Sequence, residues 1–420
     1  MHFTRYSVRL QAHPERVSAY YGAVFAMSLG KPLFGALSDR LPRCRRRRSV
    51  MVPACVSAAV CAVLMGAAVR TEAQLYAVGM TTALAYCAAE AAADGALVEA
   101  ATGTEEVATL QVSAMGIRTA ASAAASVAGA ASLRLAAPRA LISAAGVFGA
   151  AAAVASTGLR EVTTADAQDA PTAAPALAPA SGVLLVPCVR QACAMLQRFA
   201  GPMALIIALS VVPSSDDSYA AFITTALRPP LLDWQFGLAM ACDTMGALVG
   251  TVAYGFASRG RATRSMLAGC TLIAAIGSLL RLVAPMGCLG MPPAMVVPLA
   301  AAGVSATARF AFMPQLVLYA QLAPAGAEAM AFSAFATLAD GAALAGTGMS
   351  AALTAALRVG SAPGRSWQHL PTLVLLCAGM RLLPLVLLPL LFQKRQEPGR
   401  LVQTEEGADL TAPLLEDTDS

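Results

Sequence analysis

Several ionisable residues lie within long apolar stretches of the chain, and seven of them are the candidates for chemistry: Lys31, Glu90, Asp94, Arg118, Asp217, Arg309 and Asp340. A charged group inside a bilayer is costly, so each is a candidate for substrate binding or coupling. Glu90 and Asp94 stand at i and i+4 and share one face of a helix. Two acids on one face cannot both ionise cheaply in a low dielectric without a cation or a proton. This pair therefore indicates a pathway or coupling role.

Three of these residues also have a purely structural interpretation. Lys31 lies about 10 Å from the end of its predicted helix, so its amine can extend to the interface. Arg118 and Arg309 suit a substrate contact and a structural salt bridge equally well. These alternatives stay open at the level of sequence.

The residue types argue against an enzyme. The three histidines, His2, His13 and His369, fall outside the apolar stretches. The chain has no HExxH zinc motif, no GxGD motif and no GxxxxGK[ST] phosphate-binding loop. We therefore expect no catalytic activity, no metal and no cofactor. The net charge of +5 comes from arginines between the apolar stretches, where membrane topology explains them, so nucleic acid is not an expected partner.

The elements that position these residues are membrane-spanning helices. Hydrophobic residues make up 57% of the 420-residue chain and charged residues 13%, against about 25% charged residues in soluble domains. The mean hydropathy is +0.64. Runs of about 20 apolar residues can cross a bilayer as helices. The sequence therefore predicts an all-α, polytopic protein embedded in lipid.

Eleven transmembrane helices are predicted, at roughly 17–37, 49–69, 73–100, 107–132, 138–157, 199–225, 235–257, 265–284, 293–320, 327–357 and 370–392. They form an N-terminal five-helix bundle (17–157) and a C-terminal six-helix bundle (199–392). A Pro/Ala-rich linker (158–198) separates the bundles, and an acidic tail (393–420) follows.

Orientation follows from the basic residues. Loops on the side of 38–48 carry fifteen Lys and Arg, and the opposite side carries nine. The positive-inside rule then predicts that the linker and the tail are cytoplasmic. The membrane itself is expected to be the plasma membrane or a plastid envelope.

The two bundles share a weak internal repeat. SDRLPRCRRRRS (38–49) and SRGRATRS (258–265) both begin with Ser at a helix end and re-enter the membrane at Arg-Ser. Such a repeat predicts a two-bundle transporter with its site between the halves. The same offset of 216 residues carries Asp94 to a position beside Arg309. We therefore expect acids of the first half to face a cation of the second half across a central cavity.

Four segments, in order, resemble the folate–biopterin transporter family of the major facilitator superfamily. They are GKPLFGALSDRLPRCRRRRS (30–49), EAAADGALVE (90–99), PSSDDSYAAFIT (213–224) and FMPQLVLYAQLAPAGAEAMAFSAFATLAD (312–340), the last with Pro324, Gly326 and Glu328. The resemblance extends from about residue 15 to residue 392. It implies a two-bundle major-facilitator fold and transport of folate, biopterin or related pteridines by alternating access, as a proton-coupled symporter.

The resemblance also implies roles for the charged residues. Glu90 or Asp94 would accept two hydrogen bonds from a pteridine ring, and Arg118 or Arg309 would hold the anionic tail of folate. A proton on Asp94 or Asp340 would couple transport to the proton gradient. Gly35, Asp39 and Arg40 resemble the superfamily's cytoplasmic gate motif. Simple positive-inside anchoring is the alternative, and it explains the arginines but not Gly35 or Asp39.

The chain departs from the family pattern in two respects. The family has twelve helices, and the first is missing from the eleven predicted here, which indicates a truncated gene model or an eleven-helix variant. Asp340 stands where the family usually has Asn. Two alternatives follow: a major-facilitator carrier of another small organic solute, and a degenerate paralogue that does not transport.

Overall fold

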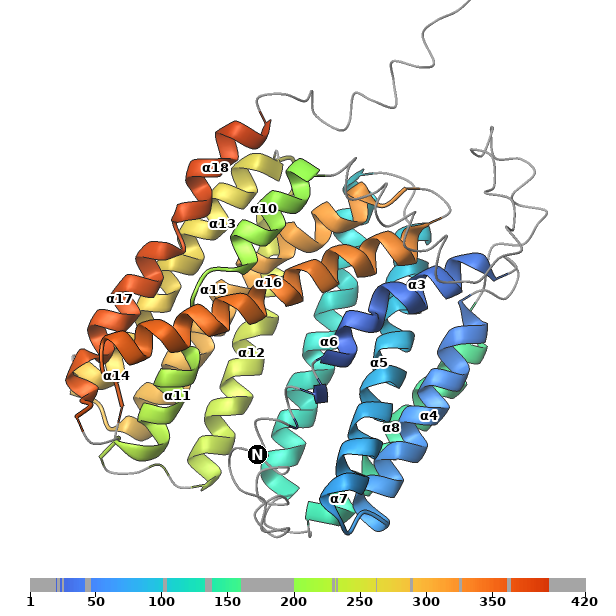
Figure 1. Ribbon diagram of the computed structural model, residues 1–420, viewed down its shortest axis with the longest axis horizontal. Helices are drawn as coiled ribbons and strands as arrows, with labels where there is room; N and C mark the ends of the chain where they lie inside the picture. The colour runs from blue at the N-terminus through green and yellow to red at the C-terminus, as the bar shows by residue number, and fades with distance from the viewer. Residues whose placement is uncertain are drawn as a thin grey trace, which may run out of the picture.

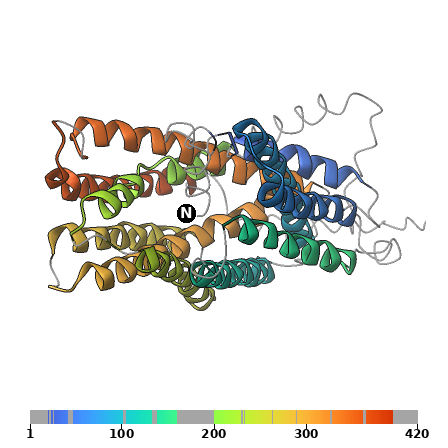
Figure 2. The same ribbon diagram turned by 90° about the horizontal axis from the view of Figure 1, so that it is seen from below.

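The described part of the chain is helical and forms two bundles that pack side by side (Figure 1). The computed structural model describes residues 26–41, 47–100, 104–132, 138–159, 200–228, 233–261, 263–287, 290–324, 327–360 and 364–392, with residues 20, 23, 24 and 231. The predicted linker, except for residues 158 and 159, and the tail after residue 392 lie outside the described residues. Figure 2 shows the helices of the first half grouped on the right and those of the second half on the left.

The first half contains five predicted spans. In chain order they are η1 (Met27–Gly30) with α3 (Lys31–Arg40), then α4 (Arg48–Ala67), α5 (Glu72–Ala100), α6 (Thr104–Ser132) and α7 (Pro138–Ala144) with α8 (Gly146–Thr157). The second half contains six. They are α10 (Ala200–Ser210) with α11 (Asp216–Thr225), α12 (Asp233–Ala257), α13 (Thr263–Ser278) with η2 (Leu279–Leu282) and α14 (Val283–Met286), α15 (Pro293–Leu322), α16 (Glu328–Ala356), and, after η3 (Trp367–His369), α17 (Leu370–Met380) with α18 (Leu383–Phe392).

Several predicted spans are interrupted rather than continuous, and proline explains two of the breaks. The ring of a proline clashes with the carbonyl four residues earlier and removes one backbone donor. Pro213 thus accounts for the end of α10 at Ser210, and Pro384 for the end of α17 at Met380. Hydropathy averages over such breaks, so the sequence predicts one span where the structure has two helices.

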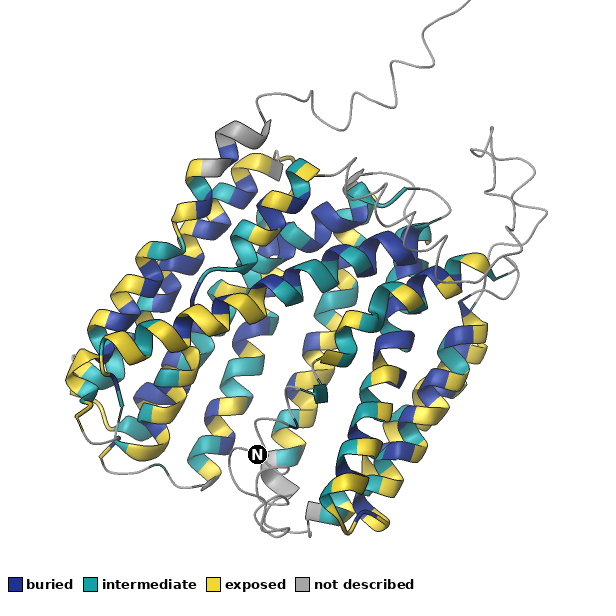
Figure 3. Cartoon of the chain, in the orientation of Figure 1, coloured by how far each residue is buried: buried dark blue, intermediate teal, exposed yellow. Residues whose placement is uncertain are grey.

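Many residues along the helices are exposed, and Figure 3 colours them yellow. Large apolar side chains are among them. Phe148 is 75% exposed, Ile117 72% and Phe256 69%. Seven of the described helices are long and apolar enough to cross a membrane. Lipid is the solvent that makes this distribution favourable, because water would penalise so large an apolar surface.

The halves contact each other in two places. Helix α6 packs along α12, and α16 crosses from the second half onto α3 and α5 (Figure 1). Gly35 lies at the crossing of α3 and α16, where a Cβ would stand 2.6 Å from the carbonyl oxygen of Ala329. This close approach of the two backbones brings charged residues of both halves together.

Helices α12 and α15 pack closely because α12 carries glycines where the two helices meet. A Cβ on Gly246 would collide with the carbonyl oxygen of Ala302, and a Cβ on Gly250 would collide with that of Ala306. Glycines four residues apart allow this tight contact between membrane helices. The pair α12–α15 supplies the wall of the second half that faces α6.

Candidate functional site

A cavity of about 600 Å³ lies between the two halves. Its polar lining comes from both: Glu90, Arg118, Thr119 and Ser122 on α5 and α6, and Asp243, Thr244, Ser305 and Arg309 on α12 and α15. This volume is in the range of pockets that hold a drug-sized molecule, about 300–1,000 Å³. Each half contributes one acid and one arginine to the lining, so the cavity can recognise a solute that carries both donors and an anionic group.

The structure separates the two predicted acids of α5. Glu90 lines the cavity, and its Oε2 lies 3.0 Å from the Nζ of Lys31 on α3. Asp94 accepts a hydrogen bond of 2.7 Å from the Nη2 of Arg118 on α6. The side chain of Glu90 is 45% exposed and that of Asp94 16%. Both acids have a basic partner, but Glu90 is exposed to the cavity, whereas Asp94 is mostly buried beside Arg118.

Lys31 lies between acids of opposite halves. Besides Glu90, its Nζ lies 3.8 Å from the Oδ2 of Asp340 on α16. The side chain of Lys31 is only 19% exposed. Its amine is thus held within the bundle by two carboxylates, which accounts for its presence there without extension to the interface.

The arginine of the second half is held differently from Arg118. Arg309 donates from Nη1 to the sulfur of Met115 at 3.5 Å, and its guanidinium lies 5.7 Å from the ring centre of Phe312. Within the described part of the chain, no carboxylate forms an ion pair with it. Asp243 instead accepts a hydrogen bond from Ser305, on the same wall of the cavity. Arg309 therefore keeps its charge available to an anionic ligand.

Asp217 is not brought to the cavity. It is exposed in the first turn of α11, where acids interact favourably with the helix dipole. Its neighbour Asp216 forms an ion pair with Arg281 within the second half. This predicted residue thus stands apart from the other six.

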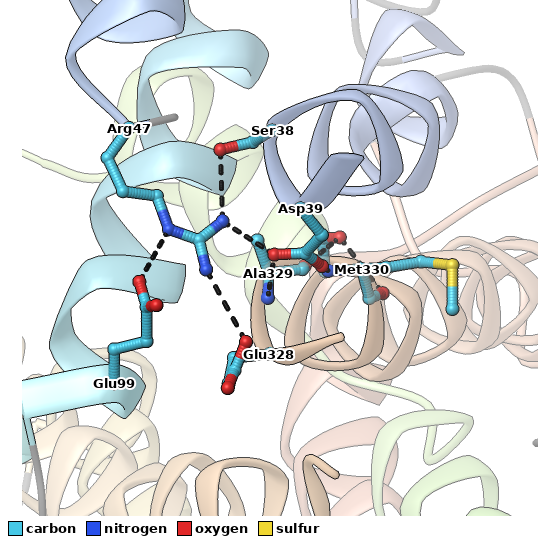
Figure 4. A network of polar contacts seen from close by, with 8 residues as sticks. Ser38, Asp39, Arg47, Glu99, Glu328, Ala329 and Met330 are labelled. Atoms are coloured by element: carbon cyan, nitrogen blue, oxygen red, sulfur yellow. Dashed lines mark hydrogen bonds and ion pairs between the residues drawn. The ribbon is translucent and has the colours of Figure 1, made fainter. Parts of the chain in front are cut away.

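A second group of charges joins the halves at the end of the bundle where α3 and α5 end and α16 begins (Figure 4). We call it the Arg47 network: Ser38, Asp39, Arg47, Glu99 and Glu328, with the backbone N–H groups of Ala329 and Met330. Arg47 lies 2.6 Å from Asp39, 2.9 Å from Glu99 and 3.6 Å from Glu328. Its side chain is only 2% exposed.

Asp39 links this network directly to the second half. Its Oδ2 accepts a hydrogen bond of 2.8 Å from the N–H of Met330, in the first turn of α16. A carboxylate at a helix N-terminus satisfies free N–H groups and complements the helix dipole. Asp39 thus binds α3 to α16 and closes the bundle at this end.

The predicted gate residue Arg40 is exposed, and Arg47 is the arginine that pairs with Asp39. Sequence reasoning missed Arg47 because it is one of six arginines in 40–48. It also missed the roles of Glu99 and Glu328. The one sequence signal for Glu328 is its place in the segment that resembles the family's Pro-Gly-x-Glu pattern. No cluster of three or more metal-ligating side chains is present among the described residues.

Comparisons with known proteins place this geometry in context. The model of the BT1 family matches residues 4–405. The fucose:proton symporter of E. coli superposes with a TM-score of 0.62 at 14% identity, covering 92% of this chain and 93% of that one. A bacterial homologue of the iron transporter ferroportin, in an outward-facing state, gives 0.60 at 16% identity, with the same coverage. No curated protein sequence matches significantly. The structural similarity confirms the predicted all-α, major-facilitator fold.

Proposed function

This chain belongs to the BT1 family, the predicted folate–biopterin transporter family, and on that basis we propose that it carries folate, biopterin or a related pteridine together with protons. The family and the fold make it a multi-pass membrane transporter of a small molecule, and its structural neighbours are transporters rather than enzymes. The substrate class and the coupling ion are the parts that we propose.

One observation carries the substrate proposal: Glu90 of one half and Arg309 of the other line the same cavity. A pteridine ring presents an amino group and a ring N–H side by side, and one carboxylate can accept both. The glutamate tail of folate is anionic, and a guanidinium can hold its carboxylate in a fork. We assign the ring to Glu90, which lines the cavity, rather than to Asp94, which does not. We assign the tail to Arg309 rather than to Arg118, because Arg118 is already hydrogen-bonded to Asp94.

The access mechanism follows from the Arg47 network. The positive-inside rule places the end of the bundle that carries this network in the cytoplasm. With Asp39 bound to α16, the halves are closed there, so the cavity would exchange with the opposite side. Rocking of the halves would break this contact and open the cytoplasmic end. Proton coupling is supported by the shared fold of the fucose:proton symporter and by Asp340, an acid whose partner Lys31 also contacts Glu90.

The test is uptake of labelled folate and biopterin into vesicles that contain the purified protein. Glu90→Gln should weaken the affinity for both pteridines by roughly ten- to hundredfold, because a charge-assisted hydrogen bond contributes about 1.5–3 kcal/mol. Glu72→Gln, the same change at the start of the same helix, is the matched control and should transport normally. Absence of pteridine uptake by the wild type, with an unrelated organic solute transported instead, would establish the alternative carrier.

Arg309→Gln separates the two pteridines. Folate carries the anionic tail and biopterin does not, so we expect a roughly ten- to hundredfold loss of affinity for folate and little change for biopterin. Arg118→Gln serves as the comparison. An equal loss for both pteridines in Arg309→Gln would mean that Arg309 supports the cavity rather than the tail.

A further inference from the structure

One amine and two acids form a group that we call the Lys31 cluster: Lys31, Glu90 and Asp340. Only its ion pair between Lys31 and Asp340 joins the two halves. Lys31 and Glu90 belong to the first half and Asp340 to the second. Other ion pairs deep in the described helices stay within one half, as in Asp94–Arg118 and Asp216–Arg281. Asp340 is therefore placed where a change of its charge acts directly on the contact between the halves.

We propose that Asp340 is the carboxylate that binds the transported proton, with Lys31 as the amine that exchanges between Asp340 and Glu90. This inference rests on the proposed transport function and names its coupling site. A proton binds to Oδ1 or Oδ2 of Asp340. It neutralises the carboxylate and so weakens the ion pair between Asp340 and Lys31.

The first argument is that Asp340 can be protonated without leaving a buried cation unpaired. Lys31 keeps its 3.0 Å contact with Glu90 when Asp340 is neutral. A proton on Asp94 would instead remove the acid to which Arg118 is hydrogen-bonded at 2.7 Å. Arg118 has no second acid within ion-pair distance among the described residues, whereas Lys31 has two, so Asp340 is the less costly site for a proton that must come and go.

The second argument is the charge of the whole site. Three cations, Lys31, Arg118 and Arg309, stand among four acids, which are Glu90, Asp94, Asp243 and Asp340. With all of them ionised, the site has one excess negative charge, which opposes the entry of an anionic solute. A proton on Asp340 makes the set neutral. Binding of the proton and binding of the anion then favour each other, as thermodynamic linkage requires.

The surroundings of Asp340 contain the groups that would sense this proton. Lys31, Glu90 and Cys87 face it from α3 and α5, and Tyr319 faces it from α15. The other elements packed on α16, which are η1, α10 and α17, carry no Asp, Glu, Lys, Arg or His. The side chain of Asp340 is 36% exposed, so water can deliver the proton. Lys31 and Glu90 are therefore the charged groups nearest to Asp340 on the elements packed against α16.

A first experiment needs no substrate. Cysteines replace Ala73, at the start of α5, and Ala356, at the end of α16, in a cysteine-depleted background, and both are spin-labelled. These positions lie on opposite halves, at the end of the bundle away from the Arg47 network. In the wild type the distribution of label distances should shift as the pH is lowered, and in Asp340→Asn the shift should be absent. Asp340→Ser is the second variant if Asp340→Asn does not fold.

Asp94→Asn is the comparison that makes this experiment decisive. We expect it to keep the pH-dependent shift, because its partner Arg118 lies in the same half. Loss of the shift in Asp94→Asn, together with its retention in Asp340→Asn, would overturn the proposal. A shift of equal size in the wild type and Asp340→Asn would do the same.

A second experiment uses labelled folate. In the wild type its affinity should rise as the pH falls, by a factor in the range of about 5- to 150-fold that is typical of coupled sites. Asp340→Asn should bind folate with an affinity that does not depend on pH, and it should exchange folate without accumulating it along a proton gradient. Normal accumulation by Asp340→Asn would overturn the proposal. A pH-dependent shift of the labels in a wild type that binds no pteridine would support the proton site while contradicting the substrate.

Discussion

The Arg47 network and the Lys31 cluster both join the two halves through charges, but they are built differently. Arg47 is 2% exposed, contacts three acids, and is supported by a carboxylate that binds the backbone of α16. Lys31 is 19% exposed and lies 3.8 Å from its acid on the other half. The first arrangement resists separation, whereas the second is loose and reached by water. One is suited to holding a conformation and the other to responding to a ligand.

The largest expected effect comes from removing the centre of the Arg47 network. Arg47→Gln leaves Asp39, Glu99 and Glu328 close together without their shared cation. Removing one partner of a buried ion pair costs about 3–5 kcal/mol, so we expect a clear fall in the thermal midpoint of the purified protein. Lys31→Gln, at the looser cluster, should lower it less. The comparison would be wrong if Lys31→Gln were the more damaging substitution.

Asp39→Asn should have a smaller and more selective effect. The amide keeps the shape but loses the charge that attracts Arg47 and the N–H of Met330, and charge-assisted hydrogen bonds contribute about 1.5–3 kcal/mol. The closed conformation is weakened while the cavity is untouched. We therefore expect slower uptake with nearly unchanged equilibrium binding, both measured on the same preparation. Equal losses of uptake and binding, or no loss of either, would leave Asp39 as an ordinary anchor.

Gly35→Ala is expected to have the smallest effect of the three. Its new methyl group would stand 2.6 Å from the carbonyl oxygen of Ala329 and would push α3 away from α16. Such overpacking costs about 1–3 kcal/mol. Gly341→Ala is the matched control, since a Cβ there meets nothing within 4 Å and alanine favours a helix. Equal thermal midpoints for the two variants would show that α3 and α16 can accommodate a methyl group at Gly35, contrary to this prediction.

The sequence predicts the all-α membrane fold because lipid selects long apolar runs whatever their neighbours are. It predicts less of the site because each charge takes its partner from another helix. Glu90 and Asp94 share a helix face, yet one is bound by Lys31 and the other by Arg118. Arg47 cannot be distinguished from its neighbouring arginines by spacing alone. The repeat between the halves predicts acids of the first half opposite Arg309, by carrying Asp94 to that position. Glu90 is the acid that lines the cavity with Arg309, whereas Asp94 binds Arg118.

Asp217 shows the limit of reasoning from hydropathy. An acid inside an apolar window was expected to lie in the transport pathway. The break after α10 instead makes it the first turn of a new helix, where exposure and the helix dipole account for it. Pro213 was visible in the sequence, but its consequence depends on whether neighbouring helices tolerate an interruption.

The glycine contact between α12 and α15 has a consequence for solute selection. Asp243 and Arg309 stand on two helices whose backbones touch at Gly246 and Gly250, so the distance between these two charges is set by the main chain. Glu90 stands on the other half and moves relative to them when the halves rock. The wall formed by α12 and α15 is then rigid, and the opposite wall, which carries Glu90, moves relative to it. Under the proposed function, a solute held by both Glu90 and Arg309 must follow this movement, whereas Asp243 and Arg309 keep a constant separation where they face one end of it.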